Sequence, residues 1–435
     1  MIPHQQRKGT YFVHGPYMRC PACGQDRLGV LLICDRHYVR RCKHCTHDVH
    51  IPLPSLEKKV IYLDQFVISN MMKELDPGSP ATAKGTNQGF YRTLFERLDR
   101  LFKLQLIICP DSPVQHDESV VDHRFNKLRL VFRHFSHGLG FEPPEAIFHA
   151  ELLDAFRRWL GRPCAAPLDR EFALNGKYNV WNDRLRIDLN YTLPGLEASL
   201  RETGENRTKH MRAVCERWRR AESFSFQAVM EGEARAIVEE PWRQWKQYAA
   251  RIAAAELTPV QSESALKDLA ALFPLAASGL VTHMLAELKE LPVEERFDKV
   301  GRFFASEEAR SVSYVRVSAL FWASLARDVR AGRKPENFPT GSLYNDVDIV
   351  AAYAPYCDAM FVDKQISHLA AQAELKRELT PHCRLFSFRK GEDEQFLEYL
   401  AAIEREATPA HMEKVAEVYG ADWPTPYVDL LARVD

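Results

Sequence analysis

Two pairs of cysteines near the N-terminus place the strongest constraint on how this chain folds. Cys20 and Cys23 lie in "CPACG", Cys42 and Cys45 lie in "CKHC", and eighteen residues separate the two pairs. Each pair can present two thiolates to one tetrahedral ion, and the intervening length suits a short hairpin that brings the pairs together. Four thiolates close the coordination shell. The spacing therefore predicts a structural Zn²⁺ rather than a catalytic one.

Residues 1–55 resemble a zinc ribbon, a small module that often binds nucleic acid or another protein. Residues 1–59 contain ten Lys or Arg against four Asp or Glu, whereas the whole chain has a net charge of −1. The excess of positive charge is compatible with a nucleic-acid contact surface, and equally with a small module kept soluble by its charge. Four nearby histidines are alternative ligands, although four sulfurs are the simpler set: His37, His44, His47 and His50.

The length of 435 residues favours two or three domains. No run of residues approaches the roughly 18 apolar positions that a membrane span needs. The N-terminal "MIPHQQRKGTYF" lacks the apolar stretch of a secretory signal. The cysteines outside the two pairs are scattered singly, which favours a reducing compartment over a disulfide framework. We therefore expect a cytoplasmic protein without a membrane partner.

Apolar runs at 60–68 and 104–110 predict buried strands, and "AMFVD" and "RLFSF" predict two more in the C-terminal part. Between them the spacing of apolar residues is helical. The economical interpretation is one α/β domain with a mainly parallel sheet, in which strands 60–68 and 359–363 are neighbours. The predicted parts are a zinc ribbon at 1–55, the α/β domain at 56–144, a helical insertion at 145–335, and the rest of the α/β domain with C-terminal helices at 336–435.

Acidic residues follow two of the predicted strands. Asp64 lies in "VIYLDQFVIS" and Asp363 ends "AMFVD". Because acids at the ends of neighbouring parallel strands converge on one edge of a sheet, we expect these two to share a cleft. Carboxylates in one cleft repel one another unless they share cations, and Mg²⁺ or Mn²⁺ are the oxygen-preferring candidates. Further acids stand in "CPDSPVQHDES" and "LYNDVDIVAAYAPYCDAMFVDK": Asp111, Asp117, Glu118, Asp346, Asp348 and Asp358.

These segments resemble the PIN-like ribonucleases, in which an apolar strand ends in an acid and a later helix–strand pair carries two more. The resemblance covers about 60–140 and 340–390. It implies a PIN-like fold and a metal-dependent nuclease, an endoribonuclease that acts on RNA, with a metal-binding quartet of Asp64, Glu118, Asp348 and Asp363. Asp346 competes with Asp348 for the third position, since residues two apart on a helix do not face the same side. Asp346 also suits a helix cap.

Two weaker patterns suggest nucleic-acid chemistry. Arg129 and His134 match the R-x4-H spacing of HEPN-like ribonucleases, which act on the RNA 2′-hydroxyl without a metal. The basic segment 201–220 contains Trp218 among arginines, so an aromatic ring there would stack on a base while cations contact phosphates. A helix face exposed to solvent is the alternative explanation for each of the two patterns. The candidate phosphate contacts are Arg212, Arg219 and Arg220.

A non-catalytic function is the main alternative to a nuclease. In a zinc-ribbon adaptor or regulator, the α/β domain would keep its fold without catalysis, and the ribbon or the helical insertion would bind a protein or nucleic acid. Divalent-metal binding among the four acids distinguishes the two hypotheses.

Overall fold

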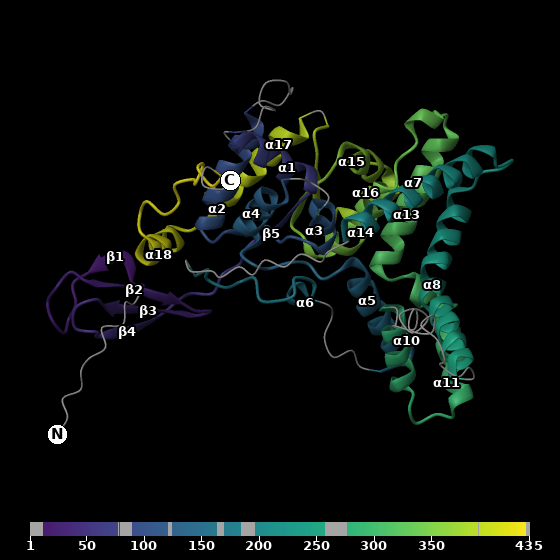
Figure 1. The fold of residues 1–435 in the computed structure, drawn as a ribbon, viewed down its shortest axis with the longest axis horizontal. Helices are drawn as coiled ribbons and strands as arrows, with labels where there is room; N and C mark the ends of the chain where they lie inside the picture. The colour runs from purple at the N-terminus through teal and green to yellow at the C-terminus, as the bar shows by residue number, and fades with distance from the viewer. Residues whose placement is uncertain are drawn as a thin grey trace.

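The computed structural model describes residues 12–76, 78, 89–120, 124–162, 169–183, 196–256, 276–389 and 391–431. The chain is mixed α/β and mostly helical. An antiparallel ribbon lies at one end, a parallel sheet with its helices lies in the middle, and an arm of long helices lies at the other end (Figure 1). None of the helices in these ranges is both long and apolar enough to cross a membrane.

The N-terminal ribbon is a four-stranded antiparallel sheet with the strand order β1-β2-β3-β4. Its apolar face packs on the C-terminal helix α18 (Pro409–Tyr419), where Val30 and Tyr38 share a core with Val418. The buried Arg40 donates a hydrogen bond of 2.7 Å to the carbonyl oxygen of Glu417. The ribbon is therefore docked on the C-terminal part of the chain. Its strands are β1 (His14–Met18), β2 (Leu28–Ile33), β3 (His37–Cys42) and β4 (Asp48–Pro52).

The central sheet is parallel and has the strand order β6-β5-β7-β8. In the pairing of β5 with β7, Ile61 lies opposite Ala359 and Leu63 lies opposite Phe361. The prediction that these two strands are neighbours is thus confirmed. Segments on either side of the helical region form one sheet. The strands are β5 (Lys59–Leu63), β6 (Ile107–Ile108), β7 (Ala359–Phe361) and β8 (Arg384–Phe386).

The predicted strand 60–68 was too long. Strand β5 ends at Leu63, Asp64 occupies the N-cap position, and helix α1 (Gln65–Leu75) follows at once. Residues 60–63 are a continuous buried run, as expected for a strand covered on both faces. The buried residues of the next segment instead recur with helical spacing, which was the overlooked signal: Val67, Ile68, Met71, Met72 and Leu75.

Helices from both ends of the chain pack around the sheet, and α2 contacts α1, α4 and α17. Asp363 ends the turn after β7 and caps α15. The helices of this part are α2 (Phe90–Lys103), α3 (Pro113–Val120), α4 (Phe125–Ser136), α15 (Lys364–Ala370), α16 (Ala373–Leu379) and α17 (Glu392–Glu406).

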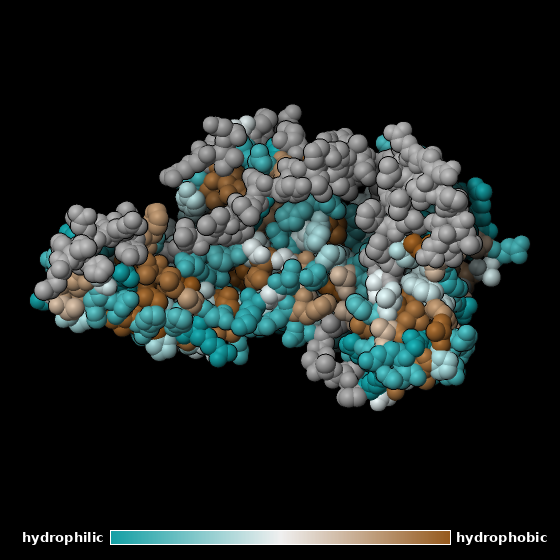
Figure 2. Space-filling view, turned by 60° about the horizontal axis from the view of Figure 1, so that its bottom comes forward, coloured by the Kyte–Doolittle hydropathy of each residue, from teal (hydrophilic) through white to brown (hydrophobic). Residues whose placement is uncertain are grey.

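The helical arm is organised around α13, which is buried along most of its length and packs against α5, α7, α8, α14 and α16. On the face drawn in Figure 2, hydrophobic surface gathers over the ribbon end and over the far end of the arm. The helices of the arm are α5 (Pro144–Trp159), α6 (Arg170–Ala173), α7 (Leu196–Arg220), α8 (Phe226–Glu256), α10 (Ala276–Glu287), α11 (Val293–Phe304), α12 (Glu307–Arg310) and α13 (Ser313–Arg330). A 3₁₀ turn at Pro335–Asn337, helix α14 (Ser342–Tyr353) and a 3₁₀ turn at Ala354–Tyr356 lead from the arm back to β7.

Candidate functional site

The four paired cysteines form one cluster in the ribbon. Cys20 and Cys23 lie in the turn between β1 and β2, while Cys42 ends β3 and Cys45 lies in the turn that follows. All four sulfur atoms lie within 4.8 Å of one another, with the Sγ atoms of Cys20 and Cys45 3.5 Å apart and those of Cys23 and Cys42 3.7 Å apart. A tetrahedral ZnS₄ site has S···S distances of about 3.8 Å, given Zn–S bonds of about 2.3 Å. The predicted four-sulfur ligand set is therefore assembled, and it is consistent with a structural zinc.

Backbone groups of the ribbon favour thiolate at one of these positions. Burial raises the pKa of Cys42, but N–H groups of Cys45 and His44 oppose it, and the net result is a pKa lowered to about 7. The amide of His44 lies 3.4 Å from the Cys42 sulfur. The thiolate is the metal-binding form, and these amide groups favour it at Cys42, whereas the pKa values of Cys23 and Cys45 are raised in the metal-free cluster. The alternative ligands His37 and His50 stack on each other instead, with ring centroids 5.6 Å apart.

A second group of polar side chains gathers at the carboxyl edge of the parallel sheet. The amide of Asp64 donates to the carbonyl oxygen of Phe361 at 3.0 Å, which fixes Asp64 beside the end of β7. Although Asp64 precedes α1, its carboxylate makes no capping hydrogen bond to that helix. Asp363 does cap its helix, since one of its oxygens accepts from the amide of Ile366 at 2.6 Å. The adjacent strands thus bring two carboxylates to one edge, and that of Asp64 is not used as a cap.

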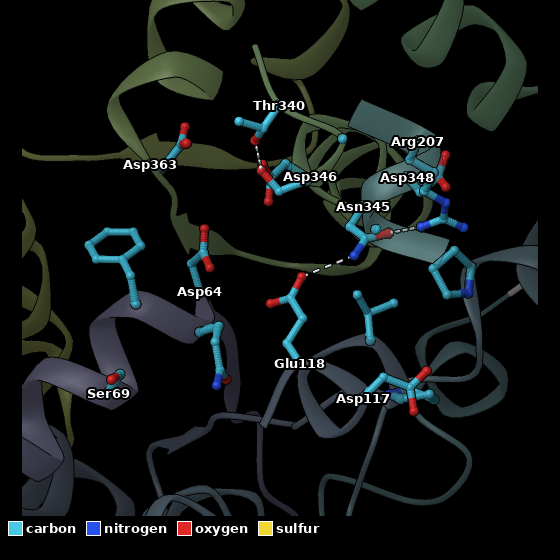
Figure 3. A pocket seen from close by; sticks show the side chains of 18 of the residues that line it. Asp64, Ser69, Asp117, Glu118, Arg207, Thr340, Asn345, Asp346, Asp348 and Asp363 are labelled. Atoms are coloured by element: carbon cyan, nitrogen blue, oxygen red, sulfur yellow. Dashed lines mark hydrogen bonds between the residues drawn. The ribbon is translucent and has the colours of Figure 1, made fainter. Parts of the chain in front are cut away.

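Two further carboxylates reach this edge from helices. Glu118 comes from α3, and its Oε1 accepts a hydrogen bond of 3.0 Å from Nδ2 of Asn345. Asp346 comes from the first half of α14. Figure 3 shows Asp64, Glu118, Asp346 and Asp363 arranged around a common open space. Asp346 lies inside its helix, so its predicted role as a helix cap is wrong.

These four carboxylates line a cavity of about 1370 Å³. The cavity is bounded by the sheet edge, by α3 and α14, and by residues of α7 from the helical arm. Within the ranges that the structure describes, the cysteines are the one group of three or more potential ligands whose donor atoms all lie within 4.8 Å of each other. The carboxylates consequently face one another across a wider opening than the sulfurs do.

Burial and mutual repulsion raise the pKa values of these carboxyl groups. The pKa of Asp64 is raised to about 7, first by burial and then by the charges of Glu118 and Asp363. The pKa of Asp346 lies well above its ordinary value because of burial and the charges of Asp64 and Asp363. Burial also raises the pKa values of Glu118 and Asp363. Among the described residues, no direct ion pair joins a lysine, arginine or histidine to any of the four carboxylates, although Arg124 and Arg207 line the same cavity.

Asp348, the residue predicted as the third acid, lies in the same cavity but has a different partner. Its Oδ1 accepts a hydrogen bond of 2.8 Å from the hydroxyl of Tyr314 on α13. Two residues on an α-helix differ by about 200° in direction, so Asp346 and Asp348 cannot present carboxylates to the same point. The structure directs Asp346, and not Asp348, toward Asp64 and Asp363 (Figure 3).

Three other acids from these segments lie outside the group. Asp117 is exposed and turned away from the four carboxylates (Figure 3). Asp111 bonds with Nε2 of His116 at 3.1 Å. Asp358 precedes β7, at the opposite edge of the sheet, and there it accepts from the amide of Val60 and pairs with Arg170, each at 2.8 Å. Asp111 and Asp358 thus have structural partners, whereas Asp117 lies at the rim of the cavity, where its charge contributes to the raised pKa of Glu118.

The structure does not bring the HEPN-like pair together. On α4, Nε2 of His134 bonds with the fully buried Asp99 at 2.7 Å. Arg129 is also buried, and its guanidinium lies 5.8 Å from the ring centroid of Phe125. Positions five apart on a helix differ by about 140° in direction, which explains why the two side chains have different neighbours.

The basic segment of α7 offers cations but no stacking ring. Trp218 is 9% exposed and belongs to the hydrophobic core, so the predicted base stacking by this residue is wrong. Arg212 is exposed. Arg219 and Arg220 are exposed too, but each pairs with Glu216, at 2.9 and 3.5 Å.

Three residues of the cavity were not found from the sequence: Asn345, Arg207 and Gln65. Asn345 and Arg207 form a hydrogen bond of 2.5 Å, and Asn345 in turn contacts Glu118. The Oε1 atom of Gln65 is buried without a partner in the described structure. Asn345 and Gln65 adjoin acids already singled out, which was the available signal. Nothing near Arg207 in the sequence indicated that it belongs here.

Comparisons of the chain with protein-family models, with curated proteins and with solved structures gave no match.

Proposed function

We propose that this chain is a metal-dependent phosphodiesterase, a nuclease of PIN-like type that acts on RNA. The observation that carries the proposal is the convergence of four carboxylates, from β5–α1, α3, α14 and β7–α15, on one cavity in which none of them forms a direct ion pair with a described cation. Raised pKa values at clustered acids in a cavity are typical of functional sites. The ligand set is Asp64, Glu118, Asp346 and Asp363, in which Asp346 replaces the Asp348 expected from the sequence.

The residues present suit a hard divalent cation. All four donors are carboxylate oxygens, which Mg²⁺ and Mn²⁺ prefer over nitrogen or sulfur. Gln65 lines the same cavity, and its buried Oε1, a neutral amide oxygen, has no hydrogen-bond partner in the described structure. A bound cation would also relieve the repulsion that raises the pKa of Asp64.

Divalent ions held here would lower the pKa of a bound water and stabilise charge on a phosphate. The carboxylates would fix the position of the ions, and Asp363 is itself held by the amide of Ile366. The hydrogen bond from Asn345 orients Glu118. RNA is the expected substrate through the family resemblance.

The test uses full-length protein purified with its zinc, in buffer freed of other divalent ions by resin rather than by a strong chelator. Labelled single-stranded RNA, DNA of the same sequence and the corresponding duplexes are incubated with Mn²⁺, Mg²⁺, Ca²⁺ or no addition. We expect cleavage of RNA with Mn²⁺ or Mg²⁺ only. Absence of cleavage with every substrate and ion, together with no Mn²⁺ binding by calorimetry, would contradict the proposal and favour the adaptor hypothesis.

The choice between the two neighbouring acids of α14 gives a sharp prediction. Asp346→Asn should reduce cleavage by more than about 100-fold, because loss of an outer-shell partner alone commonly costs 10–100-fold. Asp348→Asn should retain most activity, since the amide oxygen still accepts from Tyr314. The cleavage rates of the two variants, measured in parallel at saturating Mn²⁺, decide which of the two acids belongs to the ligand set. The reverse ranking would restore Asp348 to the ligand set.

Metal binding at this site should depend on pH. The folded-state pKa of Asp64 is about 7, above its ordinary value of 3.8. The stability that this group contributes to the metal-free protein is therefore fully present below about pH 4 and is lost as the pH rises through 7. Ionised carboxylates bind Mn²⁺ and protonated ones do not. The rise in thermal midpoint caused by saturating Mn²⁺ should consequently grow from pH 5.5 to pH 8.

Differential scanning fluorimetry with and without Mn²⁺ across this range measures the effect. The double variant Asp64→Asn/Asp346→Asn is the control and should show a small, flat response. A Mn²⁺-induced shift in the wild type that is independent of pH would contradict the prediction.

A further inference from the structure

We propose that the helical arm helps to hold the carboxylate site in shape. Helix α7 of the arm positions Glu118 through Arg207 and Asn345. This inference rests on the proposed metal site and concerns how that site is held in shape. It assigns positioning roles to Arg207 and Asn345 and makes the site dependent on the seating of α7.

The first observation is a continuous chain of hydrogen bonds from the arm to the carboxylates. Arg207 of α7 donates from Nη1 to Oδ1 of Asn345 at 2.5 Å, and Nδ2 of Asn345 donates to Oε1 of Glu118 at 3.0 Å. Both bonds are drawn in Figure 3. Because Asn345 uses its oxygen toward Arg207, its amide nitrogen is directed at Glu118. Arg207 thus fixes which end of the amide faces the carboxylate.

The second observation is that α7 packs tightly against the start of α14. The amide of Gly341 donates to Oγ1 of Thr208 at 3.0 Å. A Cβ atom at Gly341 would lie 2.7 Å from Cβ of Arg207 and 2.7 Å from the backbone nitrogen of Thr208. Gly341 has φ −64°, which any residue adopts, so the need for glycine here is steric. The absence of a side chain allows the two helices to approach.

The third observation is that α7 also contacts α3, the helix that carries Glu118. Helix α7 therefore touches two of the elements that supply carboxylates. Its opposite end is fixed to α13, where Arg330 donates to the carbonyl oxygens of Arg219 and Ala221 at 2.9 and 2.8 Å. A displacement of the arm would reach Glu118 through these contacts.

Four substitutions separate positioning from simple stability, and one of them, Asn345→Ala, breaks the chain of hydrogen bonds at its middle. Gly341→Ala inserts a methyl group between α7 and α14 without removing any polar group. Arg207→Met removes the donor, whereas Arg207→Lys keeps a cationic N–H donor. Gly232→Ala on α8 is the matched control, because its added methyl group meets no atom within 4 Å.

The measurement is Mn²⁺ affinity by calorimetry, together with the thermal midpoint of the metal-free protein. We expect Gly341→Ala and Arg207→Met to weaken Mn²⁺ binding by roughly 10–100-fold, as loss of ligand-orienting partners does, while the metal-free thermal midpoint of Arg207→Met stays close to that of wild type. Arg207→Lys should recover most of the affinity, and Gly232→Ala should leave it unchanged. The effects of Arg207→Met and Asn345→Ala should not add in the double variant, since both break one chain of bonds.

Unchanged Mn²⁺ affinity in Arg207→Met and in Asn345→Ala overturns this inference and leaves the proposed function intact. Wild-type protein that binds no Mn²⁺ overturns the proposed function and this inference with it. If Gly341→Ala fails to fold, the arginine and asparagine variants still decide the question.

Discussion

Asp64→Asn should abolish metal-dependent cleavage while leaving the fold intact. Asparagine has nearly the same shape as aspartate, but its neutral amide binds a hard cation far less well. The side chain of Asp64 makes no regular capping bond to α1, and the amide groups of Gln65 and Phe66 that interact with its carboxylate can still donate to the remaining oxygen of asparagine. We expect a loss of more than about 100-fold in rate, beyond the 10–100-fold typical of outer-shell changes.

The metal-free variant should be at least as stable as wild type. Burial and the charges of Glu118 and Asp363 raise the pKa of Asp64, so its ionised form is unfavourable in the empty site. Asp117→Asn is the matched control, since Asp117 lines the same cavity but is exposed and turned away from the other acids (Figure 3). Cleavage rates and thermal midpoints at pH 8, with and without Mn²⁺, are compared for the three proteins. Equal rates for wild type and Asp64→Asn would remove this residue from the site.

Cys20→Ser should empty the ribbon of zinc and unfold it locally. The hydrophobic core around the four cysteines is small, and its buried residues are Cys20, Leu28 and Cys42. A structural zinc contributes about 10–16 kcal/mol in zinc-finger peptides, comparable with the roughly 5–15 kcal/mol that stabilises a whole domain. Strands β1 to β4 should therefore lose amide protection, whereas the parallel sheet should keep it.

Elemental analysis and hydrogen exchange measure both parts of this prediction. Cys34→Ser makes the same chemical change in the same module, at a cysteine outside the cluster, and should retain about one zinc per chain. Tyr38 and Arg40 join the ribbon to α18, so the variant should also lose protection in that helix. Equal zinc content in the two serine variants would contradict a site formed by Cys20.

The ligands of the cysteine cluster were predictable because their geometry is local. Each C-x2-C pair occupies one tight turn, and a hairpin of fixed length joins the turns, so the spacing alone places four sulfurs together. The carboxylates of Asp64 and Asp363 were predictable for a related reason. Each comes within two residues of the end of a buried apolar strand, and neighbouring parallel strands end at one edge.

The choice between Asp346 and Asp348 was not available from the sequence. Both precede the same apolar run, and the rotation of α14 about its axis decides which one faces the other acids. That rotation is fixed by packing against α5, α7 and α13, and by the bond between Tyr314 and Asp348. The burial of Trp218 was not predictable for the same reason. Which side of a basic helix is buried depends on the elements that pack against it.

The sequence by itself determined the clustering of the four cysteines, the alternation of strands and helices on either side of the helical region, and two of the clustered acids, because each depends on short-range spacing. Only the tertiary structure decided that Asp346, rather than Asp348, faces the other clustered acids and that Arg207 lines their cavity. Arg207 comes from a helix far from the acids in the chain, and it contacts Asn345 beside Gly341, where two helix backbones approach closely. Such contacts follow from packing of whole elements, which spacing along the chain does not encode.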